Sequence, residues 1–180
     1  PYSWVVVKRL NDAPVLPDAN LVLPNIEPLN TLALPTDVNK FALGISVNNL
    51  VTGVTDADLL TSSGQPVSKG VAIIGYNKDM GTLYLSADGG DTWATPSFDV
   101  NSNNAILLRG QANRRVYFQP HVGVEGTIAD ALTIRAWDAS NNVVESVNGL
   151  QVMGYNITTV GGISPYSSTT DTVSLTVATL

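Results

Sequence analysis

The chain has 180 residues, with 15 acidic residues against nine basic ones, a formal net charge of −6, one histidine and no cysteine. Its length suits a single domain with a sizeable core, and its acidity argues against nucleic-acid and anionic-membrane partners, which need a basic surface. The missing cysteines exclude disulfides, thiol catalysis and thiolate metal sites, and no apolar run approaches the about 20 residues of a membrane span.

The order of short apolar runs predicts an all-β chain. Runs rich in Val, Ile, Thr, Leu and Tyr are broken by Asn, Gly, Asp, Ser or Pro about every 8–12 residues, and no helical period is sustained. The run at 15–23 is flanked by prolines and is expected at a sheet edge, because proline donates no ladder hydrogen bond. In chain order, strands are expected at 2–10, 15–23, 41–47, 70–76, 81–86, 105–109, 115–119, 131–138 and 170–178.

Two of these runs alternate strictly between apolar and polar residues. One face of the run at 131–138 carries Leu132, Ile134 and Ala136. One face of the run at 170–178 carries Val173 and its alternate neighbours 175 and 177. Such alternation implies one face on a core and one face in water. We therefore expect two packed sheets, a β-sandwich with Greek-key order.

Two segments are longer than such a sandwich requires. They are 52–69, rich in Thr, Ser, Gly and Asp, and 139–168, which contains several glycines. A standard immunoglobulin-type sandwich needs about 100 residues, and long irregular segments are usually functional or disordered. The extra length is expected to form long loops at one pole of the sandwich and to mark a site there.

Three short motifs are similar to those of cadherin repeats. The first is Asn-Asp-Ala-Pro at 11–14, similar to the cadherin linker, and the second is Asp-x-Asp at 56–58. The third, Leu-x-Ile-x-Ala-x-Asp at 132–138, resembles the strand that ends on a calcium-binding aspartate. The resemblance implies that these elements meet at one pole and bind Ca²⁺, with Glu27 as a looser match to an early glutamate.

Three further motifs resemble the cadherin-like modules of giant bacterial RTX adhesins. They are Phe-x-Pro-x-x-x-Val-x-Gly-Thr at 118–127, Tyr-Leu-Ser-Ala-Asp-Gly-Gly-Asp-Thr-Trp at 84–93, and Tyr-Ser-Ser-Thr-Thr-Asp-Thr at 166–172. The first departs from the pattern at Val124, where an aromatic residue is usual. The resemblance covers 11–180, which would form the module, while 1–10 would be the closing strand of a preceding repeat or an N-terminal linker.

The acidic and amide residues of the cadherin-like motifs are suitable ligands for calcium. Ca²⁺ takes six to eight oxygen ligands from carboxylates, amides and backbone carbonyls, and clustered carboxylates repel one another without a cation. The alternative is that these acids are solvated loop residues. The predicted metal ligands are Asn11, Asp12, Glu27, Asp56, Asp58 and Asp138.

No catalytic constellation stands out, and the chain is not expected to be an enzyme. The pattern Ser-x-Asp-x-Gly-x-Thr-Trp at 86–93 also matches the Asp-box hairpin of sialidases and propellers, but only one copy is present, whereas a propeller repeats its blades. We interpret it as a structural hairpin, with an Asp-box glycosidase fragment as a remote alternative. His121 follows a proline in a turn-like stretch and is interpreted as an exposed turn residue.

The resemblance implies a calcium-dependent cell-adhesion module, extracellular and at the cell surface, cut from a large secreted bacterial adhesin and monomeric when isolated. Its partners would be neighbouring adhesin repeats and a peptide or glycan on a target cell. The ligand is expected beside the metal pole, at Glu145, Tyr155 and Asn156 of the long segment 139–168. The alternative is a passive extender that calcium merely rigidifies.

Overall fold

The computed structural model describes residues 10–27, 43–58 and 68–179. As predicted, this part of the chain is mostly β-sheet, and its helical content is the single turn α1 (Val47–Leu50). The strands expected at 70–76 and 81–86 have the predicted bounds. The strand expected at 2–10 lies outside the described residues apart from Leu10, and so does the beginning of the one expected at 41–47.

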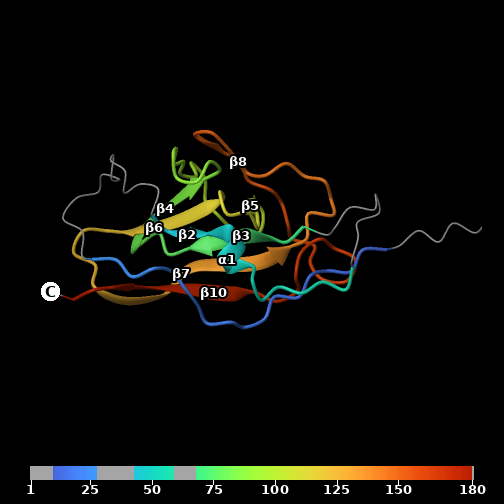
Figure 1. The fold of residues 1–180 in the computed structure, drawn as a ribbon, viewed down its shortest axis with the longest axis horizontal. Helices are drawn as coiled ribbons and strands as arrows, with labels where there is room; N and C mark the ends of the chain where they lie inside the picture. The colour runs from blue at the N-terminus through green and yellow to red at the C-terminus, as the bar shows by residue number, and fades with distance from the viewer. Residues whose placement is uncertain (1–9, 28–42, 59–67, 180) are drawn as a thin grey trace, which may run out of the picture.

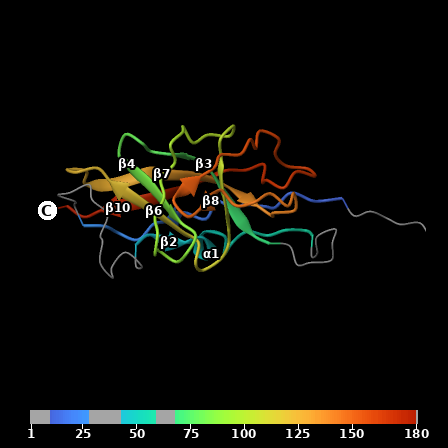
Figure 2. The same cartoon turned by 90° about the horizontal axis from the view of Figure 1, so that it is seen from above.

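One sheet has five strands, in the order β1 (Leu21–Val22), β10 (Asp171–Val177), β7 (Gly126–Trp137), β3 (Gly70–Tyr76) and β5 (Ile106–Arg109). The first strand runs parallel to β10, and every other pair is antiparallel. The proline-flanked segment therefore supplies an edge strand, as its sequence predicts, but the strand is confined to Leu21–Val22 instead of spanning 15–23, and Val15 forms only an isolated bridge with Thr55. Strands β7 and β10 lie side by side along the long axis of the molecule (Figures 1 and 2).

The other sheet has three strands, in the order β2 (Ile45–Ser46), β6 (Arg115–Pro120) and β4 (Gly81–Ser86). It shares one hydrophobic core with the five-stranded sheet, because alternate residues of each sheet face the other. The alternating faces predicted at 132–136 and 173–177 are buried there. Core residues from both sheets, each at most 1% exposed, include Ile73, Leu83, Leu85, Ile106, Val116, Phe118, Leu132, Ile134, Ala136, Val173, Leu175 and Val177.

Strand β7 is longer than its sequence pattern predicts. It begins at Gly126 rather than near residue 131, and its first half pairs with the end of β10. The polar residues Thr127 and Asp130 interrupt the alternation there, and the ladder with β10 changes register between Val173 and Leu175. The early half of the strand is therefore fixed by its partner rather than by its own periodicity.

A second, smaller core lies on the opposite face of the five-stranded sheet. Trp137, Ala72 and Leu107 project from β7, β3 and β5, next to residues that face the main core. The long segment 139–168 folds back over them and adds Ile157 and Tyr166, both at most 6% exposed. This segment therefore makes a partial third layer rather than an open loop.

The same segment covers the outer edge of β5. Ser146 donates its backbone N–H to Leu107 O at 2.9 Å, and its hydroxyl accepts the N–H of Leu107 at 2.7 Å. Tyr155 and Ala105 exchange two backbone hydrogen bonds of 2.8 and 2.9 Å. Between these contacts, β8 (Val147–Asn148) and β9 (Gln151–Val152) form a small hairpin, which rises above β5 in Figure 1. Since exposed edges invite pairing with other chains, much of this length has a structural purpose.

No helix among the described residues has the length and apolar character needed to cross a bilayer. The two ends of the described chain lie at opposite ends of the long axis, with the C-terminus at the left of Figure 1.

Candidate functional site

Three separate segments meet where β7 ends. Asp138 follows the last residue of β7, and Val15 and Thr55 exchange backbone hydrogen bonds of 2.8 and 3.1 Å. That isolated bridge places segment 11–14 beside segment 55–58, and Ala13 N donates to Gly162 O at 2.8 Å. The fold thus gathers the cadherin-like motifs at one end of the sheet, called the acidic end here.

Amide donors link the side chains at the acidic end into one group. Asn11 Nδ2 donates to Asp138 Oδ2 at 2.9 Å, and the backbone N–H of Asp12 donates to Asp58 Oδ2 at 2.7 Å. The N–H of Asp58 in turn donates to Asp56 Oδ1 at 2.8 Å. These five residues, Asn11, Asp12, Asp56, Asp58 and Asp138, are called the acidic cluster below.

Two carboxylates of the acidic cluster are electrostatically unfavourable as anions. Asp138 is only 2% exposed, and burial raises its pKa although Ser140 and Asn11 donate to it. Burial also raises the pKa of Asp56, and the charges of Asp138, Asp58 and Asp12 raise it further. Its Oδ2 atom is buried and has no hydrogen-bond partner among the described residues. A cation nearby would relieve both costs.

The backbone turns sharply directly after Asp138, and this turn helps to hold the Asp138 carboxylate in position. Ala139 has φ 58°, a left-handed conformation that costs a non-glycine residue about 1–2 kcal/mol. This turn brings the N–H of Ser140 to Asp138 Oδ1 at 2.7 Å, while the N–H of Asp138 donates to Pro165 O at 3.1 Å. The surrounding bonds therefore fix this carboxylate in position despite the strain.

The acidic cluster is not a preformed metal cage. Within the described residues, no three acidic or histidine side chains converge as a group that could hold one ion. The amide donors separate the carboxylates, and neither ion pair in this part of the chain, Lys78–Asp99 or Arg114–Glu145, involves the cluster. The donor chemistry suits a hard cation such as Ca²⁺, and binding would require the side chains to turn inward.

Glu27 lies far from the acidic cluster. Its neighbour Ile26 pairs with Val177, which is opposite Gly126 at the beginning of β7. Asp138 lies beyond the other end of that 12-residue strand, roughly 40 Å away at about 3.3 Å a residue. The structure therefore brings five of the six predicted metal ligands together and places Glu27 at the opposite end.

Glu145 is committed to an ion pair rather than to an open site. Its carboxylate accepts two hydrogen bonds from Arg114 Nε at 3.1 Å and one from Arg114 Nη2 at 2.7 Å. The backbone N–H of Arg109 donates to the same carboxylate at 2.7 Å. The Glu145 side chain is only 12% exposed. Glu145 therefore anchors segment 139–168 to the end of β5.

Tyr155 and Asn156 also lie on the cover of β5. The backbone of Tyr155 pairs with Ala105, and its ring packs against the second core. Asn156 accepts hydrogen bonds from Thr158 and donates to Asn103 Oδ1 at 3.3 Å. Of the three predicted ligand-binding residues, Asn156 alone lines the pocket described next.

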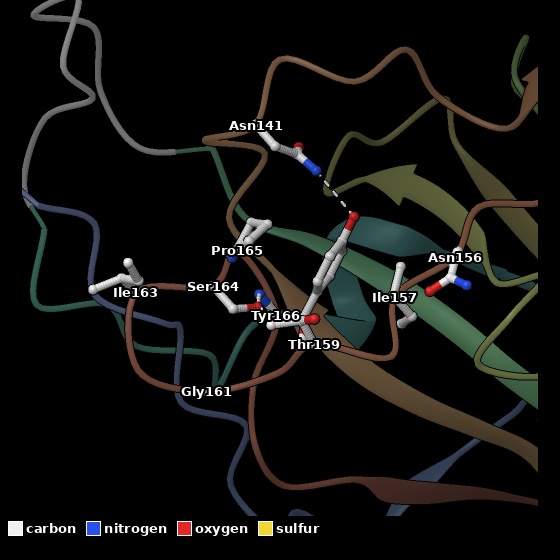
Figure 3. A pocket seen from close by; sticks show the side chains of 9 residues that line it. All are labelled: Asn141, Asn156, Ile157, Thr159, Gly161, Ile163, Ser164, Pro165 and Tyr166. Atoms are coloured by element: carbon white, nitrogen blue, oxygen red, sulfur yellow. Dashed lines mark hydrogen bonds between the residues drawn. The ribbon is translucent and has the colours of Figure 1, made fainter.

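A pocket of about 410 Å³ lies beside the acidic cluster. Tyr166 stands at its centre, with Asn141 donating to the Tyr166 hydroxyl at 3.0 Å, Ile163 on one side and Ile157 on the other (Figure 3). Its wall continues into the cluster, because Ser164 O accepts a hydrogen bond from the Asn11 side chain at 3.3 Å. The lining residues are Asn141, Asn156, Ile157, Thr159, Gly161, Ile163, Ser164, Pro165 and Tyr166.

Sequence reasoning missed most of this pocket lining. Tyr166 is noticed only as part of a motif that leads into the last strand, and Ile163 stands alone between two glycines and Ser164-Pro165. They become neighbours because segment 156–166 folds back on β7, which no local period reveals. The one signal in the sequence is the isolated Ile163 itself, which the structure shows to be 66% exposed. A second pocket of about 430 Å³, lined in part by Asp12 and Ala57, lies on the other side of Gly161.

The Asp-box pattern forms a self-contained hairpin turn. Asp88 accepts hydrogen bonds from the hydroxyl of Thr92 at 2.6 Å and from its N–H at 2.9 Å, and the Ser86 hydroxyl lies 2.7 Å away. Burial alone would raise the pKa of Asp88, but these donors lower it to about 2. Trp93 packs edge-on against Tyr117 at 6.1 Å. Every one of these contacts stabilises the turn.

Asp88→Asn should lower the free energy of unfolding by about 1 kcal/mol at neutral pH, after allowance for solvent screening. Because the folded pKa of about 2 lies below the unfolded value of 3.8, this stabilisation is present above pH 3.8 and is lost as the pH falls through 2. Urea melts of both proteins from neutral pH downward measure it. Asp99→Asn, in the exposed Lys78 pair, is the control; an equal pH-independent loss in both variants would contradict the assignment.

Comparisons of this chain with models of known protein families, with curated proteins and with solved structures find no match. Function is therefore inferred from the residues and geometry of the chain itself.

Proposed function

We propose that this chain is a calcium-binding adhesion module, a Greek-key β-sandwich of the cadherin or immunoglobulin-like kind, and that it is not an enzyme. The observation that carries the proposal is the acidic cluster, where Asp138 is buried, Asp56 is repelled by its neighbouring aspartates, and neither ion pair of the described residues involves a cluster member. Two sheets around one core, with an edge strand parallel to the last strand, support the sandwich assignment.

Calcium would complete this cluster chemically. It takes six to eight oxygens, and Asp12, Asp56, Asp58 and Asp138 supply carboxylates from three segments while the Asn11 side chain adds an amide oxygen. The carboxylates of Asp56, Asp58 and Asp138 each accept one or more amide hydrogens, so a bound ion would compete there with weak, neutral donors rather than with lysine or arginine. Binding would tie 11–12 and 56–58 to the end of β7.

The ligand of the module is proposed to be a peptide or glycan on another cell. The pocket around Tyr166 offers apolar walls and two amide side chains, which suit an organic group. The adjoining calcium would attract a carboxylate or hydroxyl that this acidic protein otherwise repels. Such a module belongs at the surface of a large secreted bacterial adhesin, monomeric when isolated and next to further repeats.

One observation favours the alternative, a passive extender. Segment 139–168 covers the edge of β5 and builds the second core, so its length needs no ligand to explain it. An extender and an adhesin would both bind calcium at the acidic cluster. They differ in whether the Tyr166 pocket has an occupant.

Peptide and glycan arrays probed with and without calcium test ligand binding. We expect calcium-dependent hits that Ile163→Ser weakens at least about tenfold, because this side chain loses its contact at the pocket rim. Val122→Ser is the matched control, since Val122 is 53% exposed in a turn at the opposite end and should leave binding unchanged. Unaltered melting curves would show that both variants fold. The absence of any calcium-dependent hit, or equal weakening by both variants, would contradict ligand binding and favour the passive extender.

A further inference from the structure

The hairpin β8–β9 carries the dipeptide Asn148-Gly149 at its tip, the one Asn-Gly sequence in the chain. Val147 pairs with Val152 and Asn148 with Gln151, which leaves Gly149 and Leu150 as a two-residue turn. Gly149 has φ 59°, as a type II′ turn requires at its first central position. The turn geometry thus accounts for Gly149, which directly follows Asn148.

The tip of the hairpin is open on all sides. Asn148, Gly149 and Leu150 are exposed, with Leu150 71% accessible, and a side chain added at Gly149 would meet nothing within 4 Å. Within the described residues, the N–H of Gly149 and the side chain of Asn148 have no hydrogen-bond partner. Both reacting groups of this dipeptide are therefore unrestrained.

We propose that Asn148 is a site of spontaneous deamidation through a succinimide. The backbone nitrogen of Gly149 attacks Cγ of Asn148, so that a C–N bond forms and the Cγ–Nδ2 bond breaks. The leaving nitrogen takes up the proton lost by Gly149 N and departs as ammonia. Water then opens the five-membered ring at either carbonyl and gives aspartate or isoaspartate, so one water is consumed and one ammonia released. Glycine favours the attack because it has no side chain to block the approach.

The chain contains a natural comparison at Asp88-Gly89. There the N–H of Gly89 donates to Asn113 O at 2.8 Å, and the carboxylate of Asp88 is held by Thr92 and Ser86. Both groups that would have to react are occupied. The substitution Asp88→Asn gives the same Asn-Gly dipeptide in this restrained turn, so the two sites share the reacting dipeptide and differ in structure.

The aspartate or isoaspartate product would alter segment 139–168, which covers the edge of β5. Deamidation adds one negative charge to the formal −6 of the chain, three residues after Glu145. Isoaspartate also lengthens the main chain by one methylene in a hairpin whose register is fixed by two residue pairs. The next contacts along the chain, Ser146 with Leu107 and Glu145 with Arg114, are those that anchor segment 139–168.

Peptide mapping by mass spectrometry, with an isoaspartate assay, follows the reaction in protein incubated at mildly alkaline pH. In folded Asp88→Asn, we expect position 148 to react at least about tenfold faster than position 88, a barrier difference of about 1.4 kcal/mol. In denaturant the two rates should converge. Asn148→Gln should abolish the reaction at the tip, because glutamine would have to form a six-membered ring.

Equal rates at positions 148 and 88 in the folded protein would overturn the proposal. If Asp88→Asn does not fold, the unsubstituted chain decides alone, since Asn148 must then react ahead of every other asparagine in the native protein. A native protein in which another asparagine reacts first, or in which Asn148 reacts only after denaturation, would equally refute it.

Discussion

Trp137→Ala is expected to lower the free energy of unfolding by about 3–5 kcal/mol. The side chain is fully buried, its Nε1 donates to Asn141 Oδ1 at 3.2 Å, and the Arg109 guanidinium lies 5.4 Å from its ring centroid. Removing it leaves a cavity between the sheet and segment 139–168 and takes away the indole N–H that orients the Asn141 amide toward the Tyr166 hydroxyl. Urea denaturation measures the loss.

Trp93→Ala is the matched control for this prediction. Trp93 is only partly buried and packs edge-on against Tyr117 on the other sheet, so its loss should cost about 1–2 kcal/mol. Limited proteolysis adds a second readout, since segment 139–168 should become cleavable in Trp137→Ala but not in Trp93→Ala. Equal destabilisation by the two substitutions would contradict the role assigned to the second core.

Calcium is expected to stabilise the chain by about 1.4 kcal/mol at tenfold excess over Kd and by about 2.7 kcal/mol at hundredfold excess. Extracellular calcium sites often have Kd near 10⁻⁴–10⁻³ M. Adding calcium to about 10 mM, at least tenfold above that range, should raise the melting temperature by about 3–6 °C over that in EDTA. An unchanged melting curve would refute calcium binding at the acidic cluster.

The effect of Asp56→Asn on the melting temperature should change sign when calcium replaces EDTA. In EDTA the substitution removes a partly buried charge that three aspartates repel, so the variant should melt at the same temperature as the unsubstituted chain or above it. In calcium the variant should melt lower, because it lacks one ligand. Asp130→Asn, on an exposed aspartate of β7 that accepts a hydrogen bond from Asn77, should show no such reversal. A variant less stable by the same amount in both conditions would make Asp56 a purely structural residue.

Strands β3 and β4 could be predicted because each is a short apolar run bounded by turn residues, and both have the expected bounds. In β4 the residues up to Leu85 alternate between buried and half-buried, whereas the first four residues of β3 are all buried because cores lie on both faces of that sheet. The early half of β7 and the hairpin β8–β9 could not be predicted, because their pairing partners decide them and their own residues are mostly polar or exposed.

The candidate site could be predicted in part. The motifs at 11–14, 56–58 and 138 identify the residues that the fold gathers at the acidic end, whereas Glu27 follows a strand that runs to the other end. Spacing in the sequence cannot show which way that strand runs. Glu145 could not be recognised as an anchor either, because its partner Arg114 lies 31 residues earlier in the chain.

The parallel pairing of β1 with β10 determines how the chain would respond to a pulling force. Backbone hydrogen bonds join residues 21–26 to residues 173–178. They include Leu23 N–H to Ser174 O at 2.8 Å and Ala178 N–H to Ile26 O at 2.9 Å. The described chain enters at the acidic end and leaves at the opposite end (Figure 1). Tension between Leu10 and Ala178 would therefore pull the two strands past each other along their length. All these bonds would be loaded at once in shear, instead of opening one after another as they would in an unzipping geometry, and the molecule should resist extension most strongly along its own long axis.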